Sequence, residues 1–137
     1  MNGVNNLIAL RNLTLTSCNM LHNKLEKNGY KFIKNNRLLP GRPCISFETY
    51  KIAVYVDTPL NNLNSNWLRQ KINKENELLT ESGYLVLRFW DYDIINKFST
   101  CILEIETAVA FRIYKINTKN ISFKYLNPSM MDRCLKL

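Results

Sequence analysis

Histidine, glycine and proline are scarce in this sequence, and its four cysteines are scattered at Cys18, Cys44, Cys101 and Cys134. Because no two of these cysteines form a CxxC pair, a zinc clip built from neighbouring residues is not expected. No stretch approaches the roughly 18 uncharged apolar residues that a membrane helix needs. The first residues also lack the apolar core of a secretory signal. We therefore expect an intracellular protein with reduced thiols and no membrane contact, with the mitochondrial matrix or another organelle left open as its compartment.

Acidic residues are also few, and the imbalance of charge is local. The 19 Lys and Arg outweigh the 11 Asp and Glu, which gives a formal net charge of +8. Residues 24–42 and 112–136 each hold six basic residues and one acidic residue, so each segment is net +5 and the remainder is −2 (8 − 10). Two basic segments around a near-neutral middle are typical of a protein that binds a polyanion such as nucleic acid.

The hydrophobic pattern predicts one α/β domain, because an apolar fraction of 46% in 137 residues can form a real core. We expect helices over about 16–28, 65–82 and 99–115, a short helix capped by Asp91 or Asp93, and strands over 30–35, 44–47, 51–56 and 84–90. The segment 99–115 is rich enough in β-branched residues to leave a strand open, and 121–126 is an edge strand or a docking tail. This order predicts a sandwich around a mixed central sheet.

Three stretches carry a resemblance to a known family. They are "CNMLHNKLEKNGYKF" (18–32), "LLPGRPCISFETYKIAVYVD" (38–57) and "WLRQKINKENELLTESGYLVLRFWDYDI" (67–94). In order and spacing they resemble the very-short-patch repair (Vsr) endonucleases of the PD-(D/E)XK nuclease superfamily. The resemblance implies a restriction-endonuclease-like α/β/α sandwich with a mixed central sheet. We accordingly expect an N-terminal arm (1–15), a Vsr-like nuclease-fold domain (16–115) and a basic C-terminal tail (116–137).

The resemblance also implies where a nuclease centre would lie, and there the sequence departs from the family. Family members hold magnesium with a Glu on the first helix and an Asp after a Gly-Lys/Arg-Pro turn, and these positions fall on Cys18 and Cys44. Asp57 stands at the position of a catalytic His, and Asn62 lies near that of a second His. Magnesium prefers oxygen ligands in an octahedron, so thiols are poor substitutes. We therefore expect no catalytic residues and no cofactor.

The two cysteines allow several interpretations. Cys18 and Cys44 should lie close together, since the carboxylates that they replace would share one ion. With His22 and Asp57 they could form a soft-metal site for zinc, whereas two packed neutral thiols and a surface histidine are the simpler interpretation. A disulfide between the cysteines and a Cys18 thiolate activated by His22 are further alternatives.

Candidate nucleic-acid contacts are cations of the basic segments, cations around the expected cleft, and one aromatic ring. They are Lys31, Lys34, Arg37, Arg42, Trp67, Lys71, Lys74, Lys119 and Lys124. Trp67 follows an Asn-rich loop at the start of a predicted helix, which favours an exposed ring for base stacking. Trp90 ends a buried strand and is expected in the core.

These patterns lead to three hypotheses. The first is a catalytically inactive nuclease-like domain that binds nucleic acid, RNA in preference to DNA, together with other proteins of a ribonucleoprotein assembly such as an organellar ribosome. The second is a divergent Vsr-like or homing-type DNA endonuclease that uses magnesium to hydrolyse phosphodiester bonds. The third is a protein scaffold, for which no salt-dependent binding to nucleic acid is expected.

Overall fold

The computed structural model describes residues 2–58 and 66–117, and within them the side chains of 15–58 and 66–116. Along the chain lie α1 (Asn2–Lys27), β1 (Ile33–Lys34), β2 (Ile45–Phe47), β3 (Ile52–Asp57), α2 (Asn66–Glu81), β4 (Leu85–Trp90), α3 (Asp91–Asn96) and α4 (Phe98–Asn117). The predicted edge strand at 121–126 lies outside the described residues. So do Asn62, Lys119 and Lys124.

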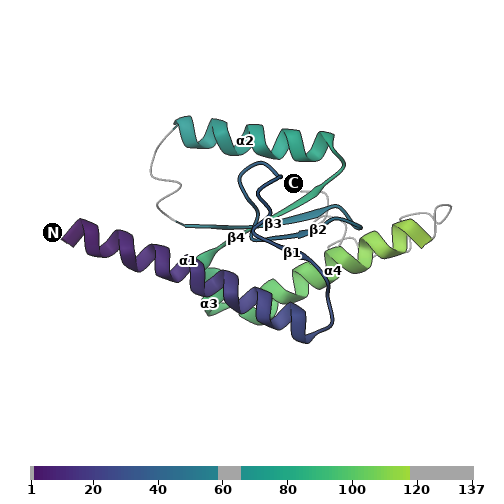
Figure 1. Cartoon of the computed structure of the whole chain (residues 1–137), viewed down its shortest axis with the longest axis horizontal. Helices are drawn as coiled ribbons and strands as arrows, with labels where there is room; N and C mark the ends of the chain where they lie inside the picture. The colour runs from purple at the N-terminus through teal and green to yellow at the C-terminus, as the bar shows by residue number, and fades with distance from the viewer. Residues whose placement is uncertain (1, 59–65, 118–137) are drawn as a thin grey trace.

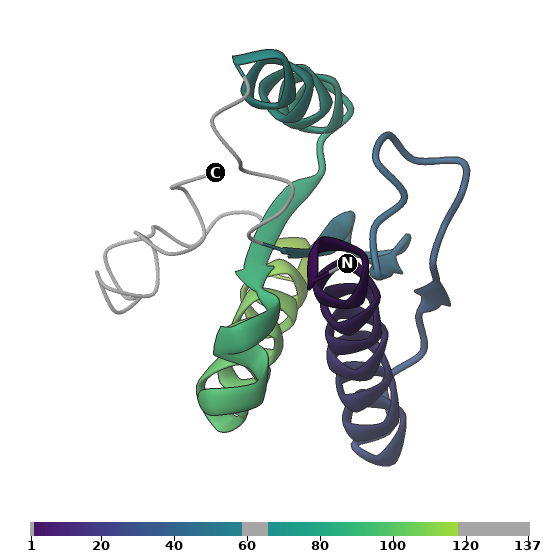
Figure 2. The same cartoon turned by 90° about the vertical axis from the view of Figure 1, so that its left-hand side faces the viewer.

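The four strands form one mixed sheet in the order β1-β2-β3-β4. Strand β2 is antiparallel to both β1 and β3. Strands β3 and β4 run parallel and pair from Ile52↔Leu85 to Asp57↔Trp90. A parallel pair needs a crossover connection, and α2 lies in that connection on one face of the sheet (Figure 1). Helices α1, α3 and α4 lie side by side on the other face (Figure 2). The result is consistent with a restriction-endonuclease-like α/β/α sandwich, which confirms the predicted fold class.

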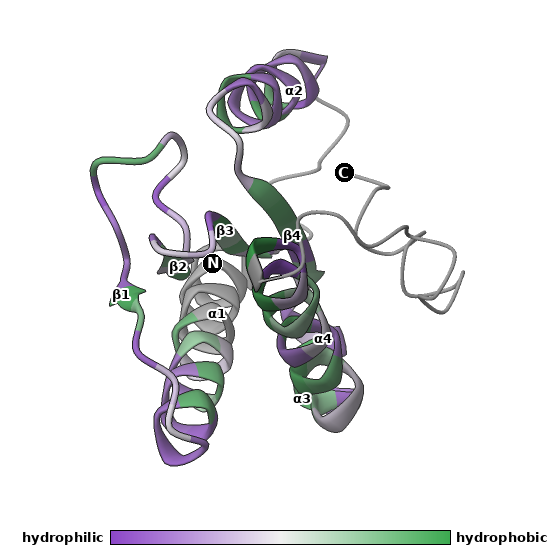
Figure 3. Ribbon diagram, turned by 90° about the vertical axis from the view of Figure 1, so that its right-hand side faces the viewer, coloured by the Kyte–Doolittle hydropathy of each residue, from purple (hydrophilic) through white to green (hydrophobic). Residues whose placement is uncertain are grey.

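Alternation along the two central strands divides the core between the two faces. Ile52 and Val54 of β3 pack in the larger cluster with Leu21 of α1 and Ile105 of α4. The intervening residues Ala53 and Tyr55 pack on the other face with Leu79 of α2 and Val86 of β4. Figure 3 shows β4 as a hydrophobic ribbon and α2 as largely hydrophilic, as expected for a strand covered on both faces and a helix with a single buried side.

The N-terminal helix differs most from its prediction, because α1 begins at Asn2 and not at Thr16 or Ser17. Ser17 lies inside the helix, fully buried, and its hydroxyl donates a hydrogen bond to the backbone carbonyl of Asp91 at 3.2 Å. The hydroxyl therefore ties α1 to α3 and does not cap a helix start. The helix is continuous across the expected boundary between arm and domain, and the division into domains stays a prediction.

Two shorter elements also differ from expectation. The strand predicted over 30–35 is reduced to Ile33–Lys34, because the rings of Tyr30 and Phe32 pack on Phe47 and Asn35 takes a positive φ of 49°. Neither Asp91 nor Asp93 caps α3: Trp90 is the N-cap residue and makes no side-chain cap hydrogen bond.

The remaining helices and strands agree with those predicted from the sequence. Residues 98–117 form a helix and not a strand, and α2 carries Leu79 buried with Leu68 and Ile72 half-buried on its inner side. Within residues 2–58 and 66–117, no helix is both long and apolar enough to cross a membrane.

The packing of α1 predicts a contrast between two leucines of that helix. Leu21 is fully buried, whereas Leu15 is 62% exposed. We expect Leu21→Ala to lower the free energy of unfolding by about 2–5 kcal/mol, because it leaves a cavity between α1 and the sheet. Leu15→Ala should change it by less than about 0.5 kcal/mol. Urea denaturation of both variants tests this, and equal losses would contradict the described packing.

Candidate functional site

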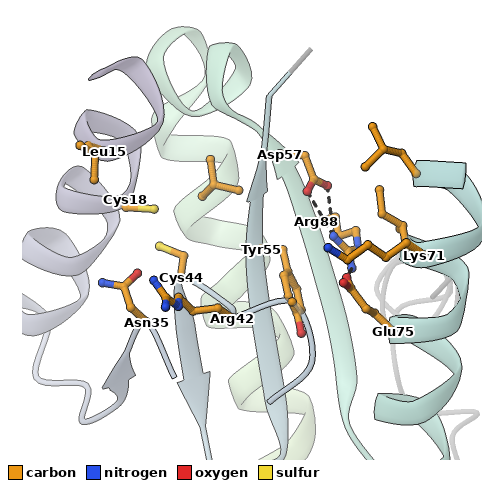
Figure 4. Close-up of a pocket in the computed structure, with 14 residues that line it drawn as sticks. Leu15, Cys18, Asn35, Arg42, Cys44, Tyr55, Asp57, Lys71, Glu75 and Arg88 are labelled. Atoms are coloured by element: carbon orange, nitrogen blue, oxygen red, sulfur yellow. Dashed lines mark hydrogen bonds and ion pairs between the residues drawn. The ribbon is translucent and has the colours of Figure 1, made fainter. Parts of the chain in front are cut away.

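A pocket of about 330 Å³ lies at the carboxyl end of β3, where four elements and one turn meet. Its walls come from α1, the turn before β2, the ends of β3 and β4, and α2 (Figure 4). The lining residues are Leu15, Cys18, Asn35, Gly41, Arg42, Cys44, Tyr55, Val56, Asp57, Leu68, Lys71, Ile72, Glu75 and Arg88. Strand β3 separates a sulfur side, next to α1, from an ionic side, next to α2 (Figure 4).

On the sulfur side, Cys18 and Cys44 point toward one another (Figure 4). The hydrogen bond from the Cys44 thiol lowers the pKa of Cys18, although burial opposes the shift. The same hydrogen bond, together with burial, raises the pKa of Cys44. His22 Nε2 lies 2.8 Å from the backbone carbonyl oxygen of Cys44 and 3.5 Å from its Sγ. The predicted proximity of the two cysteines is therefore confirmed, and both thiols are unoxidised.

On the ionic side, Arg88 of β4 holds two carboxylates. Its Nη1 lies 3.1 Å from Asp57 Oδ1 at the end of β3, and its Nη2 lies 3.4 Å from Glu75 Oε2 of α2. Its Nε donates to Asn76 Oδ1 at 3.0 Å, and the guanidinium carbon lies 4.2 Å from the centroid of the Tyr55 ring. Burial raises the pKa of Asp57, the charge and hydrogen bond of Arg88 lower it, and the charge of Glu75 raises it, with a net upward shift.

The turn before β2 is attached to this ionic side. The Tyr55 hydroxyl donates a hydrogen bond to the carbonyl of Pro40, and the Glu75 carboxylate packs against Gly41. These contacts hold Arg42 at a φ of +49°, in the left-handed region, directly before Pro43. A non-glycine residue adopts that conformation only where its surroundings enforce it. The backbone of Arg42 is positioned in this way, and its exposed side chain lines the pocket.

The pocket brings together some predicted site residues and not others. Cys18, Cys44, Asp57, Arg42 and Lys71 all line it. The other predicted cations within the described ranges lie elsewhere: Lys34 is paired with Glu26, Lys31 lines a hollow beside the β2–β3 turn, and Arg37 and Lys74 are exposed outside the pocket lining.

The two tryptophans differ as expected in exposure. Trp67 is 66% exposed at the start of α2, with Lys71 Nζ 5.6 Å from the centroid of its ring. Trp90 is half-buried and stacks on Tyr92, with 5.7 Å between the ring centroids. Trp90 therefore lies at the border of the core and not inside it.

The described residues do not form the soft-metal site that was one of several alternatives for Cys18, His22, Cys44 and Asp57. No group of three or more His, Cys, Asp or Glu side chains in the described part of the chain is arranged to hold an ion. Alternation along β3 directs Asp57 to the ionic side, where Arg88 binds it, and His22 Nε2 is engaged by Cys44.

The donor set does not fit magnesium either. The positions that the family resemblance assigns to its ligands carry thiols, which are soft donors. The nearby carboxylate oxygens of Asp57 and Glu75 are already bound to a guanidinium.

The network around Arg88 was not predicted from the sequence: Tyr55 was a candidate for base stacking, and Glu75 was expected on the outward side of its helix but is 13% exposed. One signal was present: Arg88 is the only charged residue in the apolar run "YLVLRFW", and a charge in a strand covered on both faces must find partners. The partners of Arg88 are determined by the parallel register of β3 and β4, which places Arg88 beside Tyr55.

Comparison with known proteins gives two relatives of one kind. The type II nicking enzyme V.HpaIIP of Haemophilus parainfluenzae is 28% identical over 102 aligned positions, which cover 59% of this chain and 71% of the relative. The type II nicking enzyme V.NmeDIP of Neisseria meningitidis serogroup C is 27% identical over 100 positions, with 59% and 68% covered. No family model matches the chain. These relatives give distant support to the Vsr-like resemblance and to a nuclease-type fold.

Arg88 is predicted to stabilise the fold in a pH-dependent way. Both salt-bridge side chains of Asp57 and Glu75 are largely buried, with 16% and 13% exposed. Arg88→Met should lower the free energy of unfolding by about 2–4 kcal/mol at pH 7, because it leaves two carboxylates without a counter-charge. The pKa of Asp57, which burial already raises, then rises further above that of the unfolded chain. The decrease in the free energy of unfolding of Arg88→Met is therefore expected at neutral pH and should become smaller as the pH falls toward about 4.

Urea denaturation at pH 7 and pH 4 measures this effect. Arg69→Met, an exposed position on the same α2 helix that carries Glu75, is the control and should change stability by less than about 0.5 kcal/mol at either pH. An equal loss for Arg88→Met at both pH values would contradict the described charge network.

The contact between Gly41 and Glu75 predicts a coupling that a double-mutant cycle detects. Gly41 has a φ of +71°, and a Cβ there would lie 2.5 Å from Glu75 Oε2. Gly29 has a φ of +89° with nothing within 4 Å of such a Cβ. Gly29→Ala should therefore cost about 1 kcal/mol of backbone strain alone, and Gly41→Ala up to about 1 kcal/mol more, because the end of the Glu75 side chain must move away from Arg88. In a Glu75→Ala background, Gly41→Ala should cost no more than Gly29→Ala. An unchanged cost would refute the contact.

Proposed function

We propose that this chain binds DNA at the pocket at the end of β3, through the cations on its walls. The observation that carries the proposal is the convergence of Arg42 and Lys71, from two different elements, on one opening. Fixed cations on a shared surface contact successive phosphates and release counterions, which drives binding to a polyanion. The net charge of +8 favours the same class of ligand.

Trp67 adds a second kind of contact to the proposed interface. Its exposed indole lies at the start of α2, one helical turn from Lys71. An aromatic face beside a phosphate-binding cation suits an unstacked or terminal base. The ring and the cation together extend the interface from the pocket along α2.

The relatives favour DNA over the RNA that the sequence analysis expected. Both are named nicking enzymes, and neither name supports a ribonucleoprotein, a ribosome or an organelle. DNA is therefore the ligand that we propose, and the RNA preference stays a prediction without support. The same names favour nicking of DNA as a second candidate function. We rank DNA binding before DNA nicking because magnesium is poorly bound by the thiols of Cys18 and Cys44. The carboxylate of Asp57 is in addition paired with Arg88.

Fluorescence anisotropy with a labelled duplex DNA, the same sequence as duplex RNA, and a single strand tests the proposed binding. The double variant Arg42→Ala/Lys71→Ala should bind the DNA duplex at least about tenfold more weakly. The slope of its logarithmic salt dependence should fall by about two, one for each phosphate that the variant no longer neutralises. Lys31→Ala, which removes one positive charge near the opposite end of β3, should weaken binding much less than either Arg42→Ala or Lys71→Ala alone.

Two results would overturn this assignment. Equal losses for the double variant and Lys31→Ala would show that binding does not occur at the pocket, and binding without salt dependence would favour a protein scaffold. Incubation of the protein with supercoiled plasmid and magnesium or manganese examines the second candidate. Nicking that is abolished in Asp57→Ala would establish it in place of binding alone.

A further inference from the structure

We propose that Cys18 and Cys44 form a site of reversible oxidation, at which a low-molecular-weight disulfide such as oxidised glutathione converts the two thiols into a disulfide. The new bond would tie α1 to the segment that enters β2. This inference does not depend on the proposed DNA binding.

The geometry of the pair carries the proposal. The two sulfurs point toward one another from α1 and from the start of β2 (Figure 4), and the thiols are joined by a hydrogen bond. A disulfide requires the two side chains to approach and face one another, and a hydrogen bond between the thiols shows that these two side chains do so. Both residues line the pocket of about 330 Å³, which gives a small reactant a way to reach them. The pair therefore has both the proximity and the access that oxidation requires.

The two thiols differ in environment, and this difference indicates which of them reacts first with the oxidant. Cys18 is half-buried and accepts the hydrogen bond from Cys44, which favours its thiolate. Cys44 is only 4% exposed and keeps its proton. His22 Nε2, in contact with the Cys44 carbonyl and Sγ, holds that residue in place. Cys18 is thus the attacking thiol, and Cys44 resolves the intermediate.

The exchange balances in two steps. The Cys18 thiolate attacks one sulfur of the oxidised reactant, forms a mixed disulfide and releases a thiolate, which is protonated. Cys44 then loses its proton to solvent, attacks Cys18 Sγ and expels the second thiolate, which is protonated in turn. The protein pair is oxidised by two electrons, the reactant disulfide is reduced to two thiols, and both protein thiol protons end on the released thiols.

Cys101 provides a contrast within the same chain. It is buried in α4 at 4% exposure, and burial with the charges of Glu104 and Asp93 raises its pKa to about 11. A thiol in that environment is a poor nucleophile. Cys101 should therefore remain reduced under conditions that oxidise Cys18 and Cys44.

Peptide mass spectrometry of the full chain tests the proposal. The native protein is equilibrated with mixtures of reduced and oxidised glutathione, alkylated and digested with trypsin, which separates the cysteines into different peptides. We expect the peptide with Cys18 to be linked to the peptide with Cys44, and Cys101 to be alkylated. Because the bond restricts the unfolded chain, the oxidised protein should melt roughly 5–15 °C higher than the reduced protein.

Variants separate the two roles. Cys44→Ser should accumulate one glutathionyl group on Cys18, Cys18→Ser should leave Cys44 unmodified, and Cys101→Ser should behave as the unaltered chain does. The native protein alone can refute the proposal, whatever the variants do. Alkylation of both Cys18 and Cys44 at every glutathione ratio would do so, as would a first mixed disulfide on Cys44.

Discussion

The guanidinium of Arg88 is the group on which the rest of the pocket depends. It binds Asp57 of β3 and both Glu75 and Asn76 of α2, and it covers the ring of Tyr55. Through Glu75 and Tyr55 the same network reaches the turn that carries Arg42. A largely buried charge is stable only when its partners are complete. One cation therefore links α2 to the sheet beside the apolar contact of Leu79, and reaches the turn opposite through Glu75 and Tyr55.

Strand β3 separates the thiols on one side of the pocket from the charged side chains on the other side. Tyr55 and Asp57, two residues apart, lie on the α2 face, which is ionic at the strand end, while the α1 face brings two thiols together. The hard and soft donors are consequently kept apart by a strand and cannot form one ligand set. The two sides share an opening whose walls carry Arg42 and Lys71, the two cations of the proposed DNA interface.

Much of the fold could be predicted from local patterns, whereas the site needed long-range information. The apolar runs of β3 and β4, the leucine spacing of α2 and the Pro40–Gly41 turn were all visible in the sequence. The start of α1 was missed because its Asn-rich first half lacks a strong apolar period. The approach of Cys18 and Cys44 followed from the family resemblance, whereas the pairing of Asp57 with Arg88, away from the two thiols, did not. The Arg88 network depends on the register between β3 and β4, which no local pattern specifies.

The parallel pairing of β3 with β4 also bears on how the chain can fold as it is synthesised. Strands β1, β2 and β3 are adjacent in sequence and leave the ribosome first, while the partner of β3 follows only after the whole of α2. Until then the inner edge of β3, which is apolar along most of its length, has unpaired backbone groups. A nascent chain halted between residues 58 and 85 would thus expose a strand edge prone to association with other chains, and completion of β4 removes that hazard.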